Sequence, residues 1–589
     1  MLINTTLFNG TNTNEAGDNK FISSFISILY IGYLFFYPFS YNVNVFVNSF
    51  HFFNLFICFF CLVFYIFKIF SKSAKLDVFD ILISLPSIIS WIFYENNEYA
   101  TNLFNIITIS LICLRFNINI KIILNTIIIS FFIQLILGIC QIIYGDIKIV
   151  TSVAGTFENS GIYSIYLVTT FPLLLIILHQ RLHGRYRLIC SIFFFIVVSI
   201  FVIVLKSRIS IIILVFILFT ILNLRFNVVK KLYNSNKTVV LSTLIGLAAF
   251  SMFYLFFFKE NSSYGRLLIW SVSFQNIGQY FLSGIGIGKF STYYPVWQIN
   301  YFKNNYDHHE RFFLVADETF LPFNEYLGIF IEYGFIGFSL FCFFVYKGIL
   351  MKNSECHLFL YIKLSFIAIL IASATSYPLH VNSILIHFGL CSIFIFSNYF
   401  DKIHQLFNLK SVRSIKIISC CLALAMLFNF VNILKTSVLV YKWNIAEYSA
   451  DIDLYNNLYT KLSNYPKFLL AYSEKLESGN CKFKISILKE AQNEINNANV
   501  YLGLFESYNN CNYEREALSV LNDLYYLVPN RMSFKYIQMN YLESKALYKD
   551  AILIGKEIVK MPVKVKSETT EKMQYEASIL VRKLEKAGF

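Results

Sequence analysis

The stretch "LPFNEYLGIFIEYGFIGF" (321–338) combines an apolar run with an amide and two carboxylates. Its Leu, Ile and Phe residues, and their continuation to about residue 346, predict a membrane-spanning helix. Asn324 and Glu325 stand at the start of that helix, where a capping amide and an acidic side chain are favourable. The same side chains can also line a wet cavity at the membrane surface. Capping and lining are compatible, so both interpretations stay open.

The rest of the chain has the composition of a membrane protein. Of its 589 residues, 57% are hydrophobic and 14% are charged, with a mean hydropathy of +0.58, which excludes an ordinary soluble protein. Counting runs near the ~20 residues that a span needs gives an all-α, polytopic membrane protein of about 13 spans. The runs lie near 21–40, 51–70, 78–94, 101–116, 119–143, 160–178, 188–205, 209–223, 238–258, 324–346, 358–376, 383–399 and 414–434.

The basic residues predict how the chain is oriented. The net charge of +14 gathers in alternate short loops such as "HQRLHGRYR" (179–187) and "RFNVVKKLYNSNK" (225–237), which predicts that these loops are cytoplasmic. Membrane orientation explains the charge, so no nucleic-acid partner is needed. The opposite loops, including "AGTFENS" (154–160), 259–322 and "SYPLHVN" (376–382), are poorer in cations and are expected outside.

These patterns divide the chain into five segments. We expect a cytoplasmic segment (1–20), a first transmembrane region (21–258), a large outer loop (259–322), a second transmembrane region (323–434) and an outer helical domain (435–589). In the last segment Ala517 and Ala551 stand 34 residues apart in similar stretches, which is the tetratricopeptide (TPR) period. A TPR-like domain and unrelated helical hairpins are both open. Cys481 and Cys511 pair in an oxidising compartment or remain free thiols.

Ionisable residues concentrate in the long outer loop and at its edge. They are Arg266, His308, His309, Arg311, Asp317, Glu318 and Glu325. Lys206 and Arg208 add two cations in a tight outer turn, where they either serve a site or reach towards lipid headgroups. Arginine suits a diphosphate because its guanidinium group stays charged and binds phosphate oxygens in bidentate fashion. The "GIGIGKF" stretch (284–290) lacks phosphate-loop spacing, so its glycines are interpreted as turn residues.

Four stretches in order resemble the O-antigen ligase superfamily of bacterial envelope glycosyltransferases. They are "AGTFENSGIYSIYL" (154–167), "LKSRISIIIL" (205–214), "GRLLIWSVSFQNIGQYFLSGIGIGKFSTYYP" (265–295) and "FNEYLGIFIEYGFIG" (323–337). The resemblance implies an inner-membrane enzyme, with its site and C-terminal domain periplasmic, that needs no nucleotide or metal cofactor. It would transfer a glycan from an undecaprenyl-diphosphate-linked donor to an acceptor hydroxyl.

The resemblance also assigns residues. Arg208 and Arg266 match arginines that hold the donor diphosphate, and Arg311 is added from its place in the loop. Asn324, with Lys206, is expected to line the site. Gly334 and Gly337 match the glycines of the helix-opening motif. That motif begins with a histidine base, whereas this chain has Phe323 there, which cannot take a proton.

Substitutes for the missing base are sought nearby. The candidates are Glu325, His308, His309, Asp317 and Glu318. The acceptor stays open between lipid A-core, Ser or Thr of proteins, and a growing glycan. A lipid-linked glycan transporter and a non-catalytic envelope scaffold are the alternatives from other functional classes. Substitution of Arg208 and Arg266 would discriminate, because only a transferase depends on them for glycan transfer.

Overall fold

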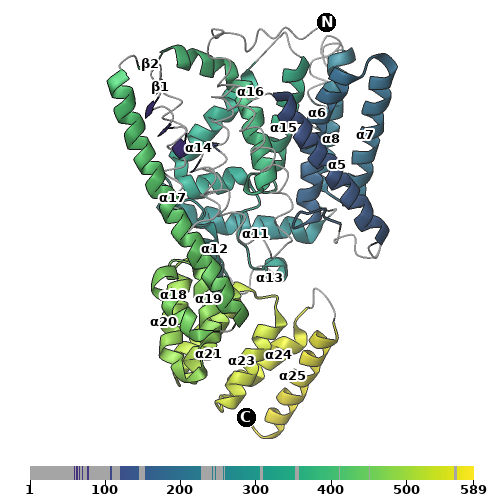
Figure 1. Cartoon of the computed structure of the whole chain (residues 1–589). Helices are drawn as coiled ribbons and strands as arrows, with labels where there is room; N and C mark the ends of the chain where they lie inside the picture. Colours follow the sequence, from purple (N-terminus) through teal and green to yellow (C-terminus); the bar gives the residue numbers. More distant parts are fainter. Residues whose placement is uncertain are drawn as a thin grey trace. The chain divides into compact units, whose positions relative to one another are not determined.

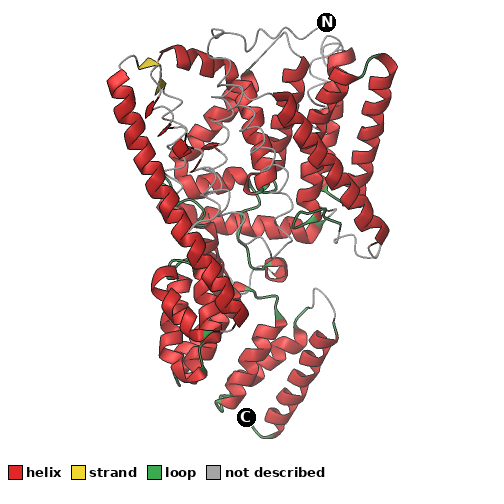
Figure 2. Ribbon diagram, in the orientation of Figure 1, coloured by secondary structure: helices red, strands yellow, loops and turns green. Residues whose placement is uncertain are grey.

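A computed structural model describes residues 120–144, 153–226, 259–304, 310–351, 357–406, 408–409, 412–449, 451–562 and 567–589, with scattered residues between 59 and 108 and at 242, 246 and 257. This part of the chain is helical (Figure 2), apart from two short antiparallel strands, β1 (Leu76–Asp77) and β2 (Asn408–Leu409). The all-α class is thus confirmed. The chain divides into two compact units, each built from separated segments.

The first unit contains residues 1–245, 323–326 and 339–438. Its helices are α5 (Ile120–Tyr144), α6 (Ser160–Arg181), α7 (Gly184–Val204), α8 (Arg208–Phe226), α15 (His357–Ser373), η6 (Pro378–His380) and α16 (Asn382–Leu406), and it includes parts of α14 (Glu325–Leu350) and α17 (Val412–Ser449). Helix α6 is the centre of the unit, since it packs against α5, α7, α8, α15 and α16 (Figure 1). Its apolar stretch is therefore largely buried within the protein.

The predicted spans agree with helices wherever the structure describes the chain. Eight predicted runs coincide with α5, α6, α7, α8, α14, α15, α16 and α17. Five of the described helices, α5, α6, α7, α14 and α17, are long and apolar enough to cross a membrane. The runs near 21–40, 51–70, 78–94, 101–116 and 238–258 lie outside the continuously described residues. The total of about thirteen spans remains a prediction.

The second unit contains residues 246–322, 327–338 and 439–589. Its first helices are α11 (Glu260–Asn276), η5 (Ile277–Tyr280), α12 (Phe290–Asn304) and α13 (Glu310–Val315). Its later helices are α18 (Ile452–Leu462), α19 (Pro466–Lys475), η7 (Ser478–Asn480), α20 (Cys481–Gln492), α21 (Ala498–Asn510), α22 (Glu514–Leu527), α23 (Met532–Ser544), α24 (Tyr548–Lys560) and α25 (Glu568–Lys586). The long loop (259–322) and the C-terminal helices therefore belong to one compact unit.

The C-terminal helices form a series of antiparallel neighbours. From α19 to α25 each helix packs against the next. Ala517 and Ala551 are fully buried in α22 and α24, where their small side chains allow close packing. Cys481 at the start of α20 and Cys511 at the end of α21 form a disulfide, which settles the pairing that the sequence left open. Tetratricopeptide geometry itself stays a prediction.

Polar contacts join the long loop to these helices. Lys289, just before α12, pairs with Glu494, and Gln298 of α12 donates to the carbonyl of Leu527 at 2.6 Å. Gln298 is buried, so its hydrogen bond is made away from competing water. Asn530 donates to the carbonyl of Leu314 at 3.1 Å. The loop is thus a docked element of the second unit.

Helix α14 is broken at Gly334, whose φ of 66° and ψ of −173° lie outside the helical region. The loop after η5 fills the break with backbone hydrogen bonds. The amide of Ile285 donates to the carbonyl of Ile331 at 2.9 Å, and the amide of Phe335 donates to the carbonyl of Phe281 at 2.7 Å. Loop residues thus replace the partners that an uninterrupted helix would have supplied.

Two glycines make this approach sterically feasible. A Cβ atom on Gly284 would lie 2.4 Å from the carbonyl oxygen of Glu332, and one on Gly334 would lie 2.2 Å from that of Leu282. Both glycines also have positive φ, a backbone conformation that is unfavourable for residues with a Cβ atom. We call this contact the glycine interlock: loop residues 281–286 against residues 331–335 of α14. Gly284, Gly286 and Gly288 all have positive φ, which agrees with the interpretation of the loop glycines as turn residues.

Candidate functional site

The segment "AGTFENS" is held by two glutamines of α5. Gln141 Oε1 accepts from the amides of Ala154 and Gly155 at 3.0 and 2.8 Å, and its Nε2 donates to the carbonyl of Gly155 at 2.8 Å. Gln134, seven residues earlier on the same helix face, bonds both the amide and the hydroxyl of Thr156. The two side-chain amides therefore fix the loop backbone immediately before α6.

That loop places Asn159 immediately before the first residue of α6. Its Oδ1 accepts from the amide of Ile162 at 2.9 Å and so caps the helix. Its Nδ2 donates to the Tyr377 hydroxyl at 2.6 Å, 218 positions along the chain. The ring of Tyr377 lies edge-on to Phe323, with centroids 5.3 Å apart. Two loops that the sequence predicts to be outside, 154–160 and 376–382, thus meet the residue before Asn324 in the first unit.

Phe323 occupies the position where the motif has histidine, and its backbone is unusual. Its φ of 51° is in the left-handed region, which is strained for a bulky residue and costs of order 1–3 kcal/mol. Such strain is found where the surroundings hold a residue in place, and here the Tyr377 ring is one such neighbour. The half-buried Asn324 follows, and α14 begins at Glu325.

The Glu325 carboxylate is buried, with 2% of its side chain exposed. Its Oε1 accepts from the amides of Leu379 and His380 at 2.7 and 3.3 Å. Its Oε2 lies 3.0 Å from Nδ1 of His380, whose side chain is 13% exposed. The short helix η6 therefore presents two backbone donors and an imidazole to one carboxylate. This carboxylate–histidine pair connects the start of α14 to the turn before α16.

Lys206 and Arg208 lie in the predicted tight turn, between α7 and α8. Lys206 is exposed and has a φ of 50°, and Arg208 is the half-buried first residue of α8. The Ser210 hydroxyl lies 2.9 Å from that of Ser164, in the second turn of α6. The N-terminal turns of α6 and α8 are therefore neighbours. Arg208 lies at the same end of the unit as Asn159.

Arg266 and Arg311 belong to the second unit. Arg266 is half-buried on α11, one turn before Trp270, whose indole donates to the carbonyl of Pro322 at 3.0 Å. Pro322 directly precedes Phe323 in the chain. Arg311 is 63% exposed, and its guanidinium group pairs with Glu260 at 2.6 Å and lies over the Tyr264 ring. Arg311 thus has protein partners in the described part of the loop.

Two candidate bases are bound to the C-terminal helices. The Asp317 carboxylate lies 3.3 Å from the Arg531 guanidinium group. Glu318 accepts from the amide of Ala498, the first residue of α21, and lies 3.6 Å from Arg531. These contacts assign both carboxylates a role in loop docking. His308 and His309 lie outside the residues that the structure describes.

The sequence did not single out His380 or Tyr377 as functional. Both lie in the stretch "SYPLHVN" (376–382), whose one distinguishing feature in the sequence is its lack of lysine and arginine. A lone histidine 55 positions from its carboxylate partner carries no spacing signal. One cue was available, because Glu325 is an acid at a membrane helix terminus and needs polar partners once buried.

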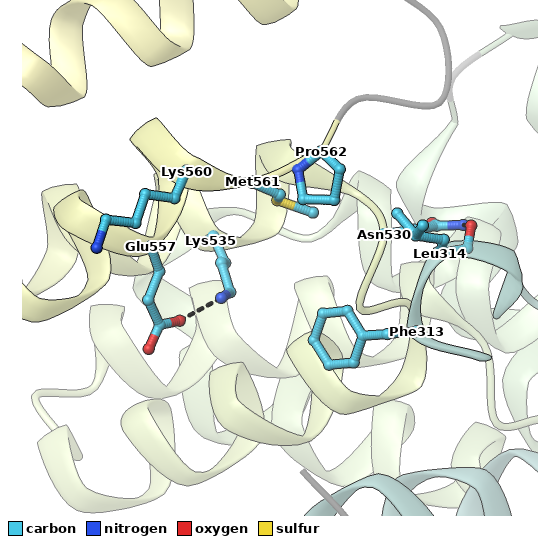
Figure 3. Close-up of a pocket in the computed structure, with 8 residues that line it drawn as sticks. All are labelled: Phe313, Leu314, Asn530, Lys535, Glu557, Lys560, Met561 and Pro562. Atoms are coloured by element: carbon cyan, nitrogen blue, oxygen red, sulfur yellow. Dashed lines mark hydrogen bonds and ion pairs between the residues drawn. The ribbon is translucent and has the colours of Figure 1, made fainter. Parts of the chain in front are cut away.

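A separate cavity of about 240 Å³ lies in the second unit, between α13 and the last helices (Figure 3). Lys535 and Glu557 pair at one side, and Phe313 and Leu314 line another. Burial lowers the pKa of Lys535, and the Glu557 carboxylate opposes that change. None of the described residues predicted for glycan transfer is among those that line this cavity.

Comparison with known protein families adds one match. A model of the O-antigen ligase family matches residues 147–342. The matched segment contains Asn159, Arg208, Arg266 and Glu325, and it ends before His380. No curated protein matches the chain.

Proposed function

Because residues 147–342 match the O-antigen ligase family, we propose that the protein transfers a glycan from a lipid-linked donor to an acceptor hydroxyl. The donor is an undecaprenyl-diphosphate-linked glycan at the outer face of the bacterial inner membrane. The observation that carries the proposal is the convergence of Asn159, Tyr377, Glu325 and His380 at the end of the first unit where Arg208 begins α8.

The chemistry follows from the donor's own leaving group. The acceptor hydroxyl attacks the anomeric carbon while the bond to the diphosphate breaks. Cations then stabilise the negative charge that grows on the departing diphosphate. Arg208 and Arg266 supply that charge. Lys206 lies in the same turn as Arg208, and Arg311 is already paired with Glu260. A single displacement predicts inversion at the anomeric carbon.

The proposed acceptor is lipid A-core, as in an O-antigen ligase. A second candidate is Ser or Thr of proteins, favoured by the docking of loop 259–322 onto the C-terminal helices. Stacked helical repeats commonly hold peptides on their concave surface. A growing lipid-linked glycan is the third acceptor within the same family.

Deleting the gene tests the function and separates these acceptors. Two gels of the deletion strain are compared with wild type: lipopolysaccharide stained for sugar, and envelope proteins probed for glycan. We expect loss of the high-mass lipopolysaccharide ladder with protein glycans retained. Loss of protein glycan with the ladder intact assigns the protein acceptor instead.

The control is the deletion strain carrying the wild-type gene on a plasmid, which should restore the lost signal. The same plasmid with Arg208→Ala should not restore it, at equal amounts of membrane-inserted protein. If neither gel changes in the deletion strain, and no second transferase is present, the transferase proposal is wrong. A transporter or scaffold would then replace it.

A further inference from the structure

The proposed transfer needs a group that takes the proton of the acceptor hydroxyl. At the position where the motif has histidine stands Phe323, whose ring carries no basic atom. The ring of Tyr377 lies against Phe323, with centroids 5.3 Å apart. His380 lies three residues after Tyr377 in the same short turn. Among the described contacts, it is the histidine that pairs with a carboxylate of α14.

The pair has the geometry of an oriented base. Glu325 Oε2 lies 3.0 Å from Nδ1 of His380, and Glu325 Oε1 is bound by two backbone amides of the same turn. These two backbone contacts fix the carboxylate that faces the imidazole. A proton held on Nδ1 by Glu325 places the basic lone pair of the neutral ring on Nε2.

We propose that His380 is the general base of the transfer reaction and that Glu325 is its positioning residue. The inference rests on the proposed function. Catalytic histidines are commonly oriented by a carboxylate that fixes the ring and stabilises the imidazolium ion. Burial of Glu325 suits that role, because a carboxylate with 2% exposure has little water to compete for its partner.

The step balances in atoms and charge. His380 Nε2 takes the proton as the acceptor oxygen forms its bond to the anomeric carbon. The anomeric carbon–oxygen bond of the donor breaks, and its electron pair leaves with undecaprenyl diphosphate. The products are the glycosylated acceptor, the lipid diphosphate and an imidazolium ion paired with Glu325. The imidazolium ion then returns its proton to water.

The other candidate bases that the structure describes already have partners in the protein. Asp317 and Glu318 contact Arg531, and Glu318 also accepts from the first amide of α21. The Glu325 carboxylate already accepts hydrogen bonds from two backbone amides and faces the imidazole. It is therefore better placed to orient His380 than to reach the acceptor hydroxyl. The matched family segment ends at residue 342, and the proposed base lies beyond it.

The test uses the purified full-length protein in liposomes. The donor is undecaprenyl-diphosphate-linked glycan extracted from the deletion strain. The acceptor is lipid A-core or envelope protein from that strain, whichever has lost its glycan. We expect His380→Ala to lower kcat about 10²–10⁴-fold, with the KM for the donor unchanged. Added imidazole should restore part of the rate, because it supplies the missing base.

Two variants separate chemistry from folding. His380→Gln keeps a donor for Glu325 but accepts no proton from a hydroxyl, so it should be as slow as His380→Ala. Glu325→Gln keeps an oxygen for the amides of Leu379 and His380 and should lower kcat by about tenfold or more. His183→Ala is the matched control, because His183 precedes α7 and makes no side-chain capping bond there. It should leave kcat unchanged.

The outcomes distinguish the two proposals. If wild type transfers glycan and His380→Gln keeps at least half of its kcat, the base assignment is wrong and the function stands. If His380→Ala loses activity only together with thermal stability, and imidazole restores nothing, His380 is structural and the assignment is again wrong. If the wild-type protein transfers no glycan from this donor, the proposed function fails first.

Discussion

At the scale of single residues, Arg208 and Arg266 are the guanidinium groups on which the proposed diphosphate recognition depends. Arg208 opens α8 beside the first turns of α6, and Arg266 lies one turn before Trp270 on α11. Both side chains are half-buried, which strengthens electrostatic interactions relative to water. The planar guanidinium group of arginine and the compact ammonium group of lysine should therefore differ in how tightly they bind the diphosphate at these positions.

Arg208→Lys and Arg266→Lys are expected to lower kcat/KM for the donor about 10–100-fold. Lysine keeps the positive charge but loses the bidentate hydrogen bond, and a charged hydrogen bond contributes roughly 1.5–3 kcal/mol. The measurement is the initial rate of glycan transfer against donor concentration. Arg185→Lys is the matched control, because Arg185 is exposed in the predicted cytoplasmic loop. Wild-type rates in both variants would exclude bidentate recognition.

The sequence located some of these residues and missed others for a physical reason. Arg208, Asn324 and Glu325 stand out because charge or amide at a membrane edge departs from local composition. Asn159 lies in the stretch "AGTFENS", where the sequence pattern assigns it no role, and its bond to Tyr377 spans 218 positions. His380 has an ordinary neighbourhood in the sequence, so only the folded chain brings it to Glu325. Local patterns predict residue types at a surface, whereas pairing depends on tertiary contact.

At the scale of elements, the glycine interlock is a contact that leaves no room for a side chain at either glycine. It joins loop residues 281–286 to the broken part of α14 through main-chain hydrogen bonds. Phe281 stacks on Phe335, with centroids 5.4 Å apart, and adds an apolar contact to the same joint. The apolar periodicity of 324–346 predicted the helix but gave no indication of a break, because the loop that stabilises the break is distant in sequence.

Gly334→Ala should destabilise the protein by more than about 3 kcal/mol. The new Cβ would meet the carbonyl of Leu282 at 2.2 Å, and a left-handed backbone is disfavoured for alanine. Thermal unfolding of the purified protein in detergent measures the effect. Gly278→Ala is the control, because a Cβ at Gly278 meets no atom within 4 Å.

A double variant tests whether the two glycines act in one contact. Gly284→Ala alone should be nearly as harmful as Gly334→Ala, since its Cβ would lie 2.4 Å from the carbonyl of Glu332. The double variant should then lose clearly less unfolding free energy than the sum of the losses in the two single variants, because either substitution alone already opens the interlock. Additive effects would show that the two positions act independently.

At the scale of the whole molecule, the compact second unit is built from segments that are far apart in the sequence. The change in composition near residue 435 suggests a separate C-terminal domain. In the structure the compact second unit also includes residues 246–322 and 327–338. Buried polar contacts such as that of Gln298 with Leu527 make this assembly, and composition does not encode them. Helix α17 likewise continues to Ser449, past the predicted end of its span.

Removing the Cys481–Cys511 disulfide should destabilise the second unit. The bridge closes a loop with a sequence separation of 30. Loss of such a constraint on the unfolded chain corresponds to about 3–4 kcal/mol, or roughly a 10 °C lower Tm. The paired variant Cys481→Ser/Cys511→Ser is compared by thermal unfolding in detergent. Cys140→Ser, at an exposed free cysteine of α5, is the control.

Two outcomes would contradict this prediction. An unchanged Tm in the paired variant would show that the bridge does not constrain unfolding of the unit. An equal decrease of Tm in Cys140→Ser would show that loss of any cysteine is enough. Treatment of the wild-type protein with a reductant should reproduce the paired variant, because it breaks the same bond.

The glycine interlock also bears on how the chain is made in the cell. A break in a helix leaves carbonyl and amide groups without their intrahelical partners. Loop residues 281–286 supply those partners, and they leave the ribosome before α14 begins at Glu325. The loop is therefore already synthesised when each half of α14 leaves the ribosome. A chain with this loop moved after α14 would have to insert the break without its partners, and insertion of that span should fail.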